Sequence, residues 1–335
     1  MAARIAGRPL LAALRRGDRR ALARAITLVE STRPEDRDAA EALIEAILPE
    51  AGHSVRIGIT GPPGAGKSTF IEAFGRAGIA RGRHIAVLAV DPASKRGGGA
   101  ILGDKTRMTE LARLPEAFIR PSSAAGGSGG VGRHSRGAIL LCEAAGFDTV
   151  VVETVGAGQS ETAVADLVDM FVLILPPAAG DELQGLKRGV VELADLVLIN
   201  KADGELAPAA LRAVADYGSA LRLLRPQYEE WGVPVRAVSA LEGTGVGETW
   251  DEVAHFQAAL EGSGAWARRR SEQARAALWA EIGSSLIEHF RAVPGVAEHL
   301  VAAEADVMAG SISPQAAARQ LLASVSLWNR RTPLP

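Results

Sequence analysis

Short apolar runs alternate with longer stretches of helical periodicity in the middle of the chain. The runs are VRIGIT, IAVLAV, TVVVE, MFVLIL, LVLIN and VRAVS, which begin at residues 55, 85, 149, 170, 196 and 235. They are continuous rather than alternating, which is typical of strands buried on both faces. This pattern predicts an α/β domain over residues 53–262, with a mostly parallel central sheet and crossover helices. Residues 122–132, SSAAGGSGGVG, predict a loop.

Both flanks of this region have helical patterns. Residues 8–50 carry apolar side chains at helical spacing and predict two or three helices, in an extension over residues 1–52. Near the other end, residues 266–290 form one long amphipathic stretch, and residues 313–328 begin with a serine cap followed by a proline. We therefore expect a second helical extension over residues 263–335.

Composition limits the classes of protein that fit. The formal net charge of the 335 residues is -2, so no global basic field attracts nucleic acid or an anionic membrane. The single cysteine, Cys142, excludes an internal disulfide and a multi-cysteine zinc site. The most apolar stretch, FVLIL, is far shorter than the roughly 20 residues of a membrane helix. These features predict a cytoplasmic enzyme.

The stretch GITGPPGAGKSTF, residues 58–70, contains the spacing G-x-x-x-x-G-K-[ST]. An expected strand precedes it and an expected helix follows it, which argues against a chance glycine-rich turn. Glycines let backbone N–H groups point at the β-phosphate, Lys67 reaches the β- and γ-oxygens, and the Ser68 hydroxyl ligates magnesium. The pattern predicts a P-loop NTPase domain. The phosphate loop comprises Gly61, Pro62, Pro63, Gly64, Ala65, Gly66, Lys67 and Ser68.

Asn-Lys-x-Asp at the end of an expected strand favours guanine as the base. The carboxylate of Asp203 accepts hydrogen bonds from guanine N1–H and N2–H₂ together, the stem of Lys201 covers the ring, and Asn200 ties the loop together. The alternative is a strand end with a polar turn. A second base loop follows the next strand, where the backbone of Ser239 and Ala240 meets guanine O6. The expected base-binding residues are Asn200, Lys201, Asp203, Ser239, Ala240 and Leu241.

Carboxylates at the ends of two other expected strands suggest a magnesium site. Asp91 and Glu153 lie where the carboxyl ends of parallel strands converge on a ligand. Mg²⁺ typically takes one or two carboxylates together with phosphate oxygens. Asp104 is a third candidate, although a loop carboxylate paired with Lys105 or Arg107 explains it equally well. The expected magnesium ligands are Ser68, Asp91, Asp104 and Glu153.

The segment Glu153-Thr-Val-Gly156 resembles the D-x-x-G switch of GTPases, with Glu in place of Asp. The N–H of Gly156 would sense the γ-phosphate. Ala157 follows where a water-orienting Gln is usual, so no residue is assigned to the attacking water, and we expect slow intrinsic hydrolysis that needs a partner or a dimer. Arg107 and Lys105 are candidates for neutralising transition-state charge, although a charged loop is more often merely solvated. The candidate catalytic residues are Lys67, Asp104, Arg107 and Glu153.

Four stretches together resemble the MeaB/ArgK/MMAA family. They are DPASKRGGGAILGDKTRM, LLCEAAGFDTVVVETVGAGQSE, AAGDELQGLKRGVVELADLVLINKADG and VSALEGTGVGETWD. The resemblance runs from about residue 8 to residue 323, and ETVGxGQSE and GDELQGxKRG are its most specific parts. Members are SIMIBI-class GTPases that act as chaperones for adenosylcobalamin-dependent acyl-CoA mutases such as methylmalonyl-CoA mutase.

The resemblance implies a homodimer formed through the C-terminal helical arm. It also implies GTP-gated delivery of cofactor to the mutase, and protection or release of inactivated cofactor. Residue by residue, it assigns Lys67, Ser68 and Thr69 to the phosphates and Mg²⁺, and it places Asp91, Asp104 and Glu153 around the metal. Residues 176–187 resemble the third switch loop of the family, in which Lys187 pairs with the metal-site carboxylates in one state.

Two departures from the family pattern stand out. The usual DPSSPxSGG reads DPASKRGGG, with Ala93, Lys95 and Arg96 at the altered positions, and VGVGQ reads VGAGQ. Neither touches an expected ligand. The chain lacks the Asp-x-His-x-x-Gly pattern of a cobalamin site, so adenosylcobalamin is expected to belong to the partner mutase. Which mutase that is stays open.

Two alternative functions share these motifs. A GTP-dependent kinase, as in the older arginine or ornithine transport kinase designation, would move the γ-phosphate to an acceptor, but the sequence shows no acceptor-binding insertion. A metal-insertion GTPase for a nickel enzyme would carry a His-rich tract or paired cysteines. The chain has six scattered histidines and one cysteine, which argues against this class.

Overall fold

The computed structural model describes residues 2–91, 108–123, 130–154, 160–177 and 188–329. By its contacts the chain divides into two compact units, residues 1–274 and residues 275–335. The first unit contains the sheet and its covering helices. The boundary falls inside one long helix, so the first turns of that helix belong to the first unit.

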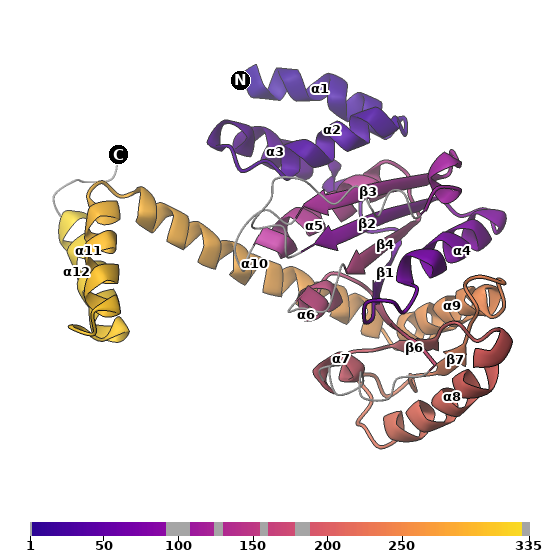
Figure 1. The fold of residues 1–335 in the computed structure, drawn as a ribbon. Helices are drawn as coiled ribbons and strands as arrows, with labels where there is room; N and C mark the ends of the chain where they lie inside the picture. Colours follow the sequence, from indigo (N-terminus) through magenta and orange to yellow (C-terminus); the bar gives the residue numbers. More distant parts are fainter. Residues whose placement is uncertain (1, 92–107, 124–129, 155–159, 178–187, 330–335) are drawn as a thin grey trace. The chain divides into compact units, whose positions relative to one another are not determined.

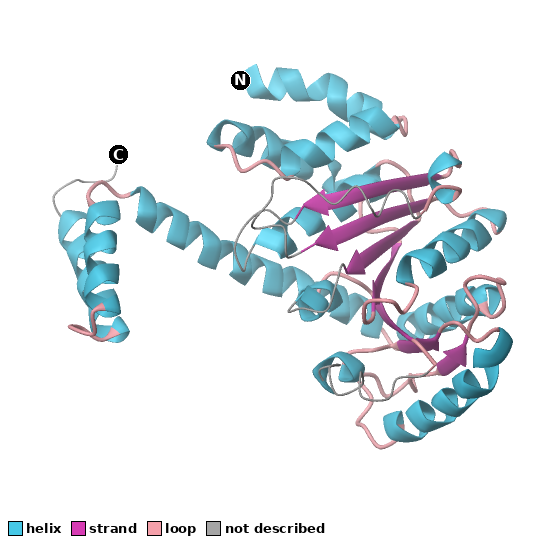
Figure 2. Cartoon of the chain, viewed as in Figure 1, coloured by secondary structure: helices cyan, strands magenta, loops and turns pink. Residues whose placement is uncertain are grey.

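A seven-stranded sheet with the order β3-β2-β4-β1-β5-β6-β7 forms the centre of the first unit (Figure 2). Every neighbouring pair is parallel. The prediction of a parallel α/β domain is therefore confirmed. The strands are β1 (Val55–Thr60), β2 (Ile85–Asp91), β3 (Ala117–Ser123), β4 (Thr149–Thr154), β5 (Met170–Leu175), β6 (Leu196–Ile199) and β7 (Val235–Ala237).

Strand β3 was not predicted, and it corrects the expected loop at residues 122–132. The strand continues to Ser123, and α5 begins at Gly130. β3 has Pro121 in its interior, which an edge strand tolerates because one side has no partner strand. Its last residues gain backbone pairing with β2, through Val90 opposite Ser122. That pairing outweighs the weak strand preference of serine.

Helices cover both faces of the sheet (Figure 1). Helices α4 and α9 pack on one face, and α5, α6, α7 and α8 pack on the other. No helix in the described ranges is long and apolar enough to span a membrane. The helices of this layer are α4 (Lys67–Ala80), α5 (Gly130–Ala144), α6 (Ser160–Ala165), α7 (Arg188–Glu192), α8 (Ala207–Leu221) and α9 (Val246–Gly262), and the short 3₁₀ segments are η1 (Leu48–Glu50), η3 (Leu111–Arg113) and η5 (Gly204–Leu206).

The terminal helices confirm the helical patterns read at both ends. Three helices precede the sheet, α1 (Ala2–Arg15), α2 (Arg19–Val29) and α3 (Pro34–Ile47), and they contact α5. Three follow it, α10 (Ala265–Ala292), α11 (Val296–Met308) and α12 (Pro314–Asn329). Within the second unit, α11 and α12 pack against each other. Pro314 opens α12, as the sequence predicted, and the hydroxyl of Ser313 accepts a hydrogen bond from the Ala316 N–H at 3.3 Å.

Aromatic stacking fixes the helix that follows the phosphate loop. The rings of Phe74 on α4 and Trp250 on α9 stack with centroids 4.2 Å apart, and the indole N–H of Trp250 donates to the Phe74 carbonyl at 2.9 Å. Gly78 leaves the room that this ring needs, because a Cβ there would lie 2.4 Å from Trp250. The middle of α4 is thereby held in place by α9, its neighbour on the same face of the sheet.

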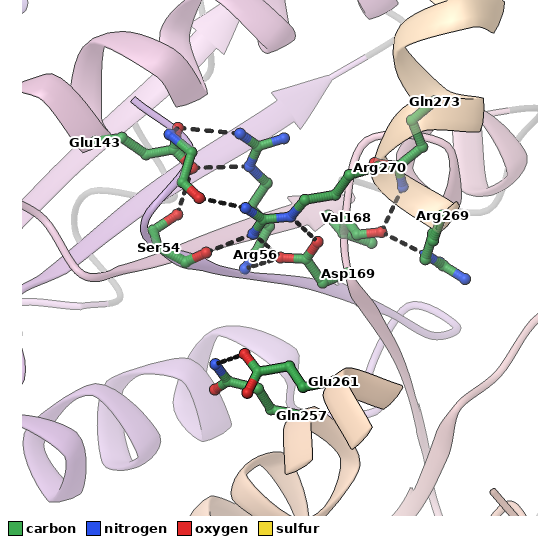
Figure 3. Close-up of polar contacts among 11 residues, drawn as sticks. Ser54, Arg56, Glu143, Val168, Asp169, Gln257, Glu261, Arg269, Arg270 and Gln273 are labelled. Carbon is green, nitrogen blue, oxygen red and sulfur yellow. Dashed lines mark hydrogen bonds and ion pairs between the residues drawn. The ribbon is translucent and has the colours of Figure 1, made fainter. Parts of the chain in front are cut away.

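Buried charges at the amino ends of the strands tie the first turns of α10 to the sheet (Figure 3). The Arg56 guanidinium on β1 donates two hydrogen bonds to Glu143 of α5, at 2.8 and 3.0 Å. Asp169, just before β5, accepts from Arg270 of α10 at 2.7 and 2.6 Å. The Arg56 guanidinium holds the pKa of the Glu143 carboxyl below its usual range despite burial.

Asp195, just before β6, is another buried carboxyl group at the amino ends of the strands. It is 1% exposed, and it accepts the backbone N–H of Phe171 at 2.8 Å. Burial raises its pKa to about 7, against the opposing influence of the nearby Arg269 guanidinium. The folded protein therefore holds a proton on Asp195 in a pH range where the unfolded chain has released it.

This difference predicts a pH-dependent effect of Asp195→Asn. The stability that proton uptake gives is fully present below about pH 4 and is lost as the pH rises through about 7. Asparagine does not ionise, so the free energy of unfolding of the variant relative to wild type should rise by roughly 2–3 kcal/mol between pH 5 and pH 8. Urea unfolding at both pH values measures it, with the exposed Asp216→Asn as control. A pH-independent difference would contradict the proposed protonation.

Candidate nucleotide-binding site

The phosphate loop joins β1 to α4 at the carboxyl edge of the sheet. Two glycines have no substitute there. A Cβ at Gly61 would lie 2.1 Å from the carbonyl oxygen of Ile174, and Gly66 has a φ of +86° with its missing Cβ 2.6 Å from the Asn200 amide. Gly66 is also the N-cap of α4 and has no side chain to cap the first N–H groups. The helix therefore begins with backbone donors suited to an anion.

Lys67 is held against its own loop. Its ammonium donates to the carbonyls of Gly61 at 2.8 Å and Pro62 at 3.2 Å. A phosphate oxygen carries formal charge and is a stronger acceptor than a carbonyl, so a bound β- or γ-phosphate would compete for these bonds. Elsewhere in the loop Ala65 is buried, whereas Pro63 and Gly64 are exposed. Thr69, in the first turn of α4, is exposed as well.

Ser68 and Glu153 meet below the loop. The Ser68 hydroxyl, in the first turn of α4, donates to Glu153 Oε1 at 3.0 Å, and both side chains are buried. They are hard oxygen donors from two different elements, which is the chemistry that Mg²⁺ requires. Together with phosphate oxygens they would hold the ion. Asp91 is the last residue of β2, on the same edge of the sheet as Glu153.

Several predicted site residues lie outside the described parts of the chain. These are Asp104, Arg107, Gly156 and Lys187. The side chain of Asp91 is likewise not described. Their assigned roles therefore stay predictions from the sequence.

A pair of hydroxyl groups links the strands that lead to the phosphate loop and to the expected switch. Thr60, the last residue of β1, and Thr154, the last residue of β4, share a hydrogen bond of 2.8 Å between their side-chain oxygens. Both side chains are buried. The pair fixes the separation of the two strands at the point where their loops diverge. This pair was not predicted, because its local signal in the sequence is no more than a hydroxyl residue at the end of each strand.

Asn200 joins the phosphate loop to the second base loop, the one that contains Ser239 and Ala240. Its amide N–H₂ donates to the carbonyl of Ala65 at 2.9 Å, and its Oδ1 accepts the backbone N–H of Ala240 at 3.1 Å. The side chain is 1% exposed. Because both ends of one rigid amide are used, the two loops are held at a fixed distance from each other.

Asp203 links the first base loop, Asn-Lys-x-Asp, to the second. Its carboxylate accepts a short hydrogen bond from the Ser239 hydroxyl, which in turn accepts the backbone N–H of Glu242 at 3.1 Å. Only the backbone of Ser239 was predicted to contact guanine, so this role of its side chain was not predicted. Lys201 has a φ of +60°, an unusual backbone conformation that often occurs at binding sites. Leu241 is 81% exposed beside this loop.

The parallel sheet, the glycine-rich loop between β1 and α4 and the polar end of β6 define a P-loop nucleoside-triphosphate-binding protein. Residues 22–295 match the family model described as "Methylmalonyl Co-A mutase-associated GTPase MeaB". The chain belongs to this family of GTPases, and the resemblance read from its motifs is confirmed.

Relatives cover nearly the whole chain. It is 48% identical over 323 residues to "Methylmalonic aciduria type A homolog, mitochondrial" of Mus musculus, covering 93% of this chain and 78% of that protein. It is 45% identical over 308 residues to "GTPase ArgK" of Escherichia coli K12, covering 92% and 93%. The crystal structure of the LAO/AO transport system kinase superposes with a TM-score of 0.75 at 39% identity, covering 95% of this chain and 97% of that chain.

The geometry around Asp203 predicts a change of base preference in Asp203→Asn. The asparagine would present a donor to guanine N2–H₂, which also donates, whereas xanthine has a carbonyl at that position. GTP affinity should fall by roughly 2–4 kcal/mol, because a bidentate contact is lost. Isothermal titration with GTP and XTP measures both affinities. Unchanged GTP binding would contradict the guanine assignment.

Proposed function

We propose that this chain is a Mg²⁺-dependent GTP hydrolase that gates the loading of adenosylcobalamin into an acyl-CoA mutase and protects or reactivates that enzyme. The observation that carries the nucleotide part is the Asn200 side chain, which holds a phosphate loop and a guanine-type base loop together. The family description names a mutase-associated GTPase, and this supports the partner. Cobalamin enters only through that partner.

In this proposal the protein's own residues position GTP for hydrolysis to GDP and phosphate. Lys67 and the N-terminal turn of α4 bind the β- and γ-phosphates, while Asp203 selects the base. Ser68 and Glu153 would hold Mg²⁺, with Asp91 and Asp104 as further proposed ligands. When bound, the ion neutralises charge that develops on the phosphates. Gly156 is proposed to sense the γ-phosphate, and Arg107 to neutralise transition-state charge.

We further propose that the second unit forms a homodimer. Several large apolar side chains of α10 are exposed within it, at 59% for Leu278, 64% for Trp279 and 65% for Leu286. Ile282 and Ile287 continue this apolar surface at helical spacing. Burying such side chains against a second copy would remove them from water.

A kinase is the second candidate, and one observation favours it. The solved structure at 39% identity is described as a transport system kinase. A kinase would transfer the γ-phosphate of GTP to an acceptor, whereas a hydrolase releases inorganic phosphate. Incubation with GTP radiolabelled at the γ-phosphate, with and without candidate acceptors, separates the two. Label in an acceptor would support the kinase.

The mutase proposal predicts that a partner enzyme accelerates hydrolysis. A cognate cobalamin-dependent mutase without cofactor should raise the rate of phosphate release by roughly fivefold or more, because it binds one nucleotide state better than the other. Chelation of Mg²⁺ should abolish release in both conditions. Lys187→Ala should lose more of the stimulated rate than of the basal rate.

Lys67→Ala serves as the control, because it should lose both rates. The mutase part of the proposal is contradicted if no cobalamin-dependent mutase of the same organism changes the rate or co-elutes with the protein in either nucleotide state. Hydrolysis without any mutase would still identify the GTPase.

A further inference from the structure

Three side chains from the first turns of α10 bind the short connection between α6 and β5 (Figure 3). Arg269 Nε donates to the carbonyl of Val168 at 3.0 Å, and Gln273 Nε2 donates to the same carbonyl at 2.8 Å. Arg269 Nη2 also donates to the carbonyl of Ala165, the last residue of α6, at 3.3 Å. These carbonyls at and after a helix end have lost their intrahelical partners, and α10 supplies donors for them.

Arg270 strengthens the same attachment one residue further on. It forms two hydrogen bonds with Asp169, and its Nη2 also donates to the carbonyl of Ser54 at 2.6 Å. Asp169 Oδ2 accepts the backbone N–H of Arg56 at 2.9 Å as well. Since Asp169 is 1% exposed, removal of Arg270 would leave a buried charge without its ion partner. Arg270 is therefore chiefly a stabilising residue.

The connection held by α10 also touches the strand that carries the phosphate loop. Gly58 of β1 packs against it so closely that a Cβ there would lie 2.9 Å from Val168 and 3.1 Å from Val164 of α6. At its other end, α6 begins at Ser160, four residues after the expected γ-phosphate sensor Gly156. α6 has only six residues, and so few internal hydrogen bonds that neighbouring contacts decide its position.

We propose that Arg269 and Gln273 are positioning residues that couple the nucleotide state to the docking of residues 265–274 of α10. They fix the carboxyl end of α6, while its amino end follows the switch segment that contains Gly156. If α6 shifts between the GDP and GTP states, then either residues 265–274 of α10 move with it or their contacts oppose the shift. This inference rests on the proposed nucleotide function of the site.

Gln273 is suited to two arrangements. Its side chain is buried at 7% exposure, and its Oε1 has no hydrogen-bond partner among the described residues. A buried acceptor without a hydrogen bond destabilises the arrangement that contains it. A second arrangement of the Gln273 side chain, in which Oε1 accepts a hydrogen bond, would therefore lie close in free energy to the present one. The Arg136 guanidinium of α5 lies close, because it donates to the Gln273 carbonyl at 3.3 Å.

The test compares hydrogen exchange with nucleotide affinity in the full chain. Amide exchange of residues 265–274 is measured with saturating GDP and with a non-hydrolysable GTP analogue, both with Mg²⁺. We expect a different exchange rate in the two states for the wild type. Titration calorimetry gives the ratio of the two affinities, which should change by roughly 3- to 10-fold in Arg269→Ala and Gln273→Ala, because coupling is reciprocal.

Arg268→Ala is the matched control. Arg268 lies on the same helix but is exposed, and among the described residues its guanidinium donates to the nearby carbonyl of Ser263, at 3.2 Å. The affinity ratio should therefore stay at the wild-type value. Arg269→Lys should restore part of the ratio if a donor to Val168 is what matters. Thermal melting checks that each variant is folded. If Arg269→Ala does not fold, Gln273→Ala alone provides the test of the affinity ratio.

Two failures are distinguishable. If the wild type binds both nucleotides but exchange over residues 265–274 is the same in the two states, the coupling is overturned. It is also overturned if Arg268→Ala shifts the affinity ratio as much as Gln273→Ala does. If the wild type binds neither nucleotide, the proposed nucleotide function itself is wrong.

Discussion

One buried amide determines how the two loops of the nucleotide site are arranged. Asn200 donates to the phosphate loop at Ala65 and accepts from the second base loop at Ala240. The side chain follows β6 directly, so its position is set by a strand that is buried along its length. A loop held in this way loses little conformational freedom when a ligand binds. The fit of both loops to one nucleotide thus depends on the sheet.

The sheet and its helices keep this arrangement rigid. β1 lies between β4 and β5, and its last residue, Thr60, is hydrogen-bonded to Thr154 of β4. On one face, the stacked rings of Phe74 and Trp250 hold α4, whose first turn follows the phosphate loop. Each contact limits the movement of one loop. The residues proposed to bind phosphate, base and metal therefore lie at one edge of the sheet, where the carboxyl ends of parallel strands converge.

Local patterns in the sequence predicted most of the fold and the main motifs of the site. Continuous apolar runs marked six of the seven strands, but β3 lacked such a run because Arg120 and Pro121 interrupt it. Ser239 was assigned only a backbone role, since nothing in its neighbourhood signals the contact with Asp203. The attachment of α10 was also missed. Arg270 and Asp169 are 101 residues apart. Arg270 is the last of three consecutive arginines near a helix start, and this pattern does not indicate which buried carboxylate one of them pairs with.

The central claim is that Asn200 preorganises both loops for one guanine nucleotide. Calorimetric titration of GDP with Mg²⁺ into the wild type and into Asn200→Ala tests it, with thermal melting of each to confirm folding. The account predicts that GDP affinity falls roughly 100-fold or more, because the variant loses both hydrogen bonds that hold the loops at their distance. A folded variant that binds GDP within about threefold of wild type would contradict it.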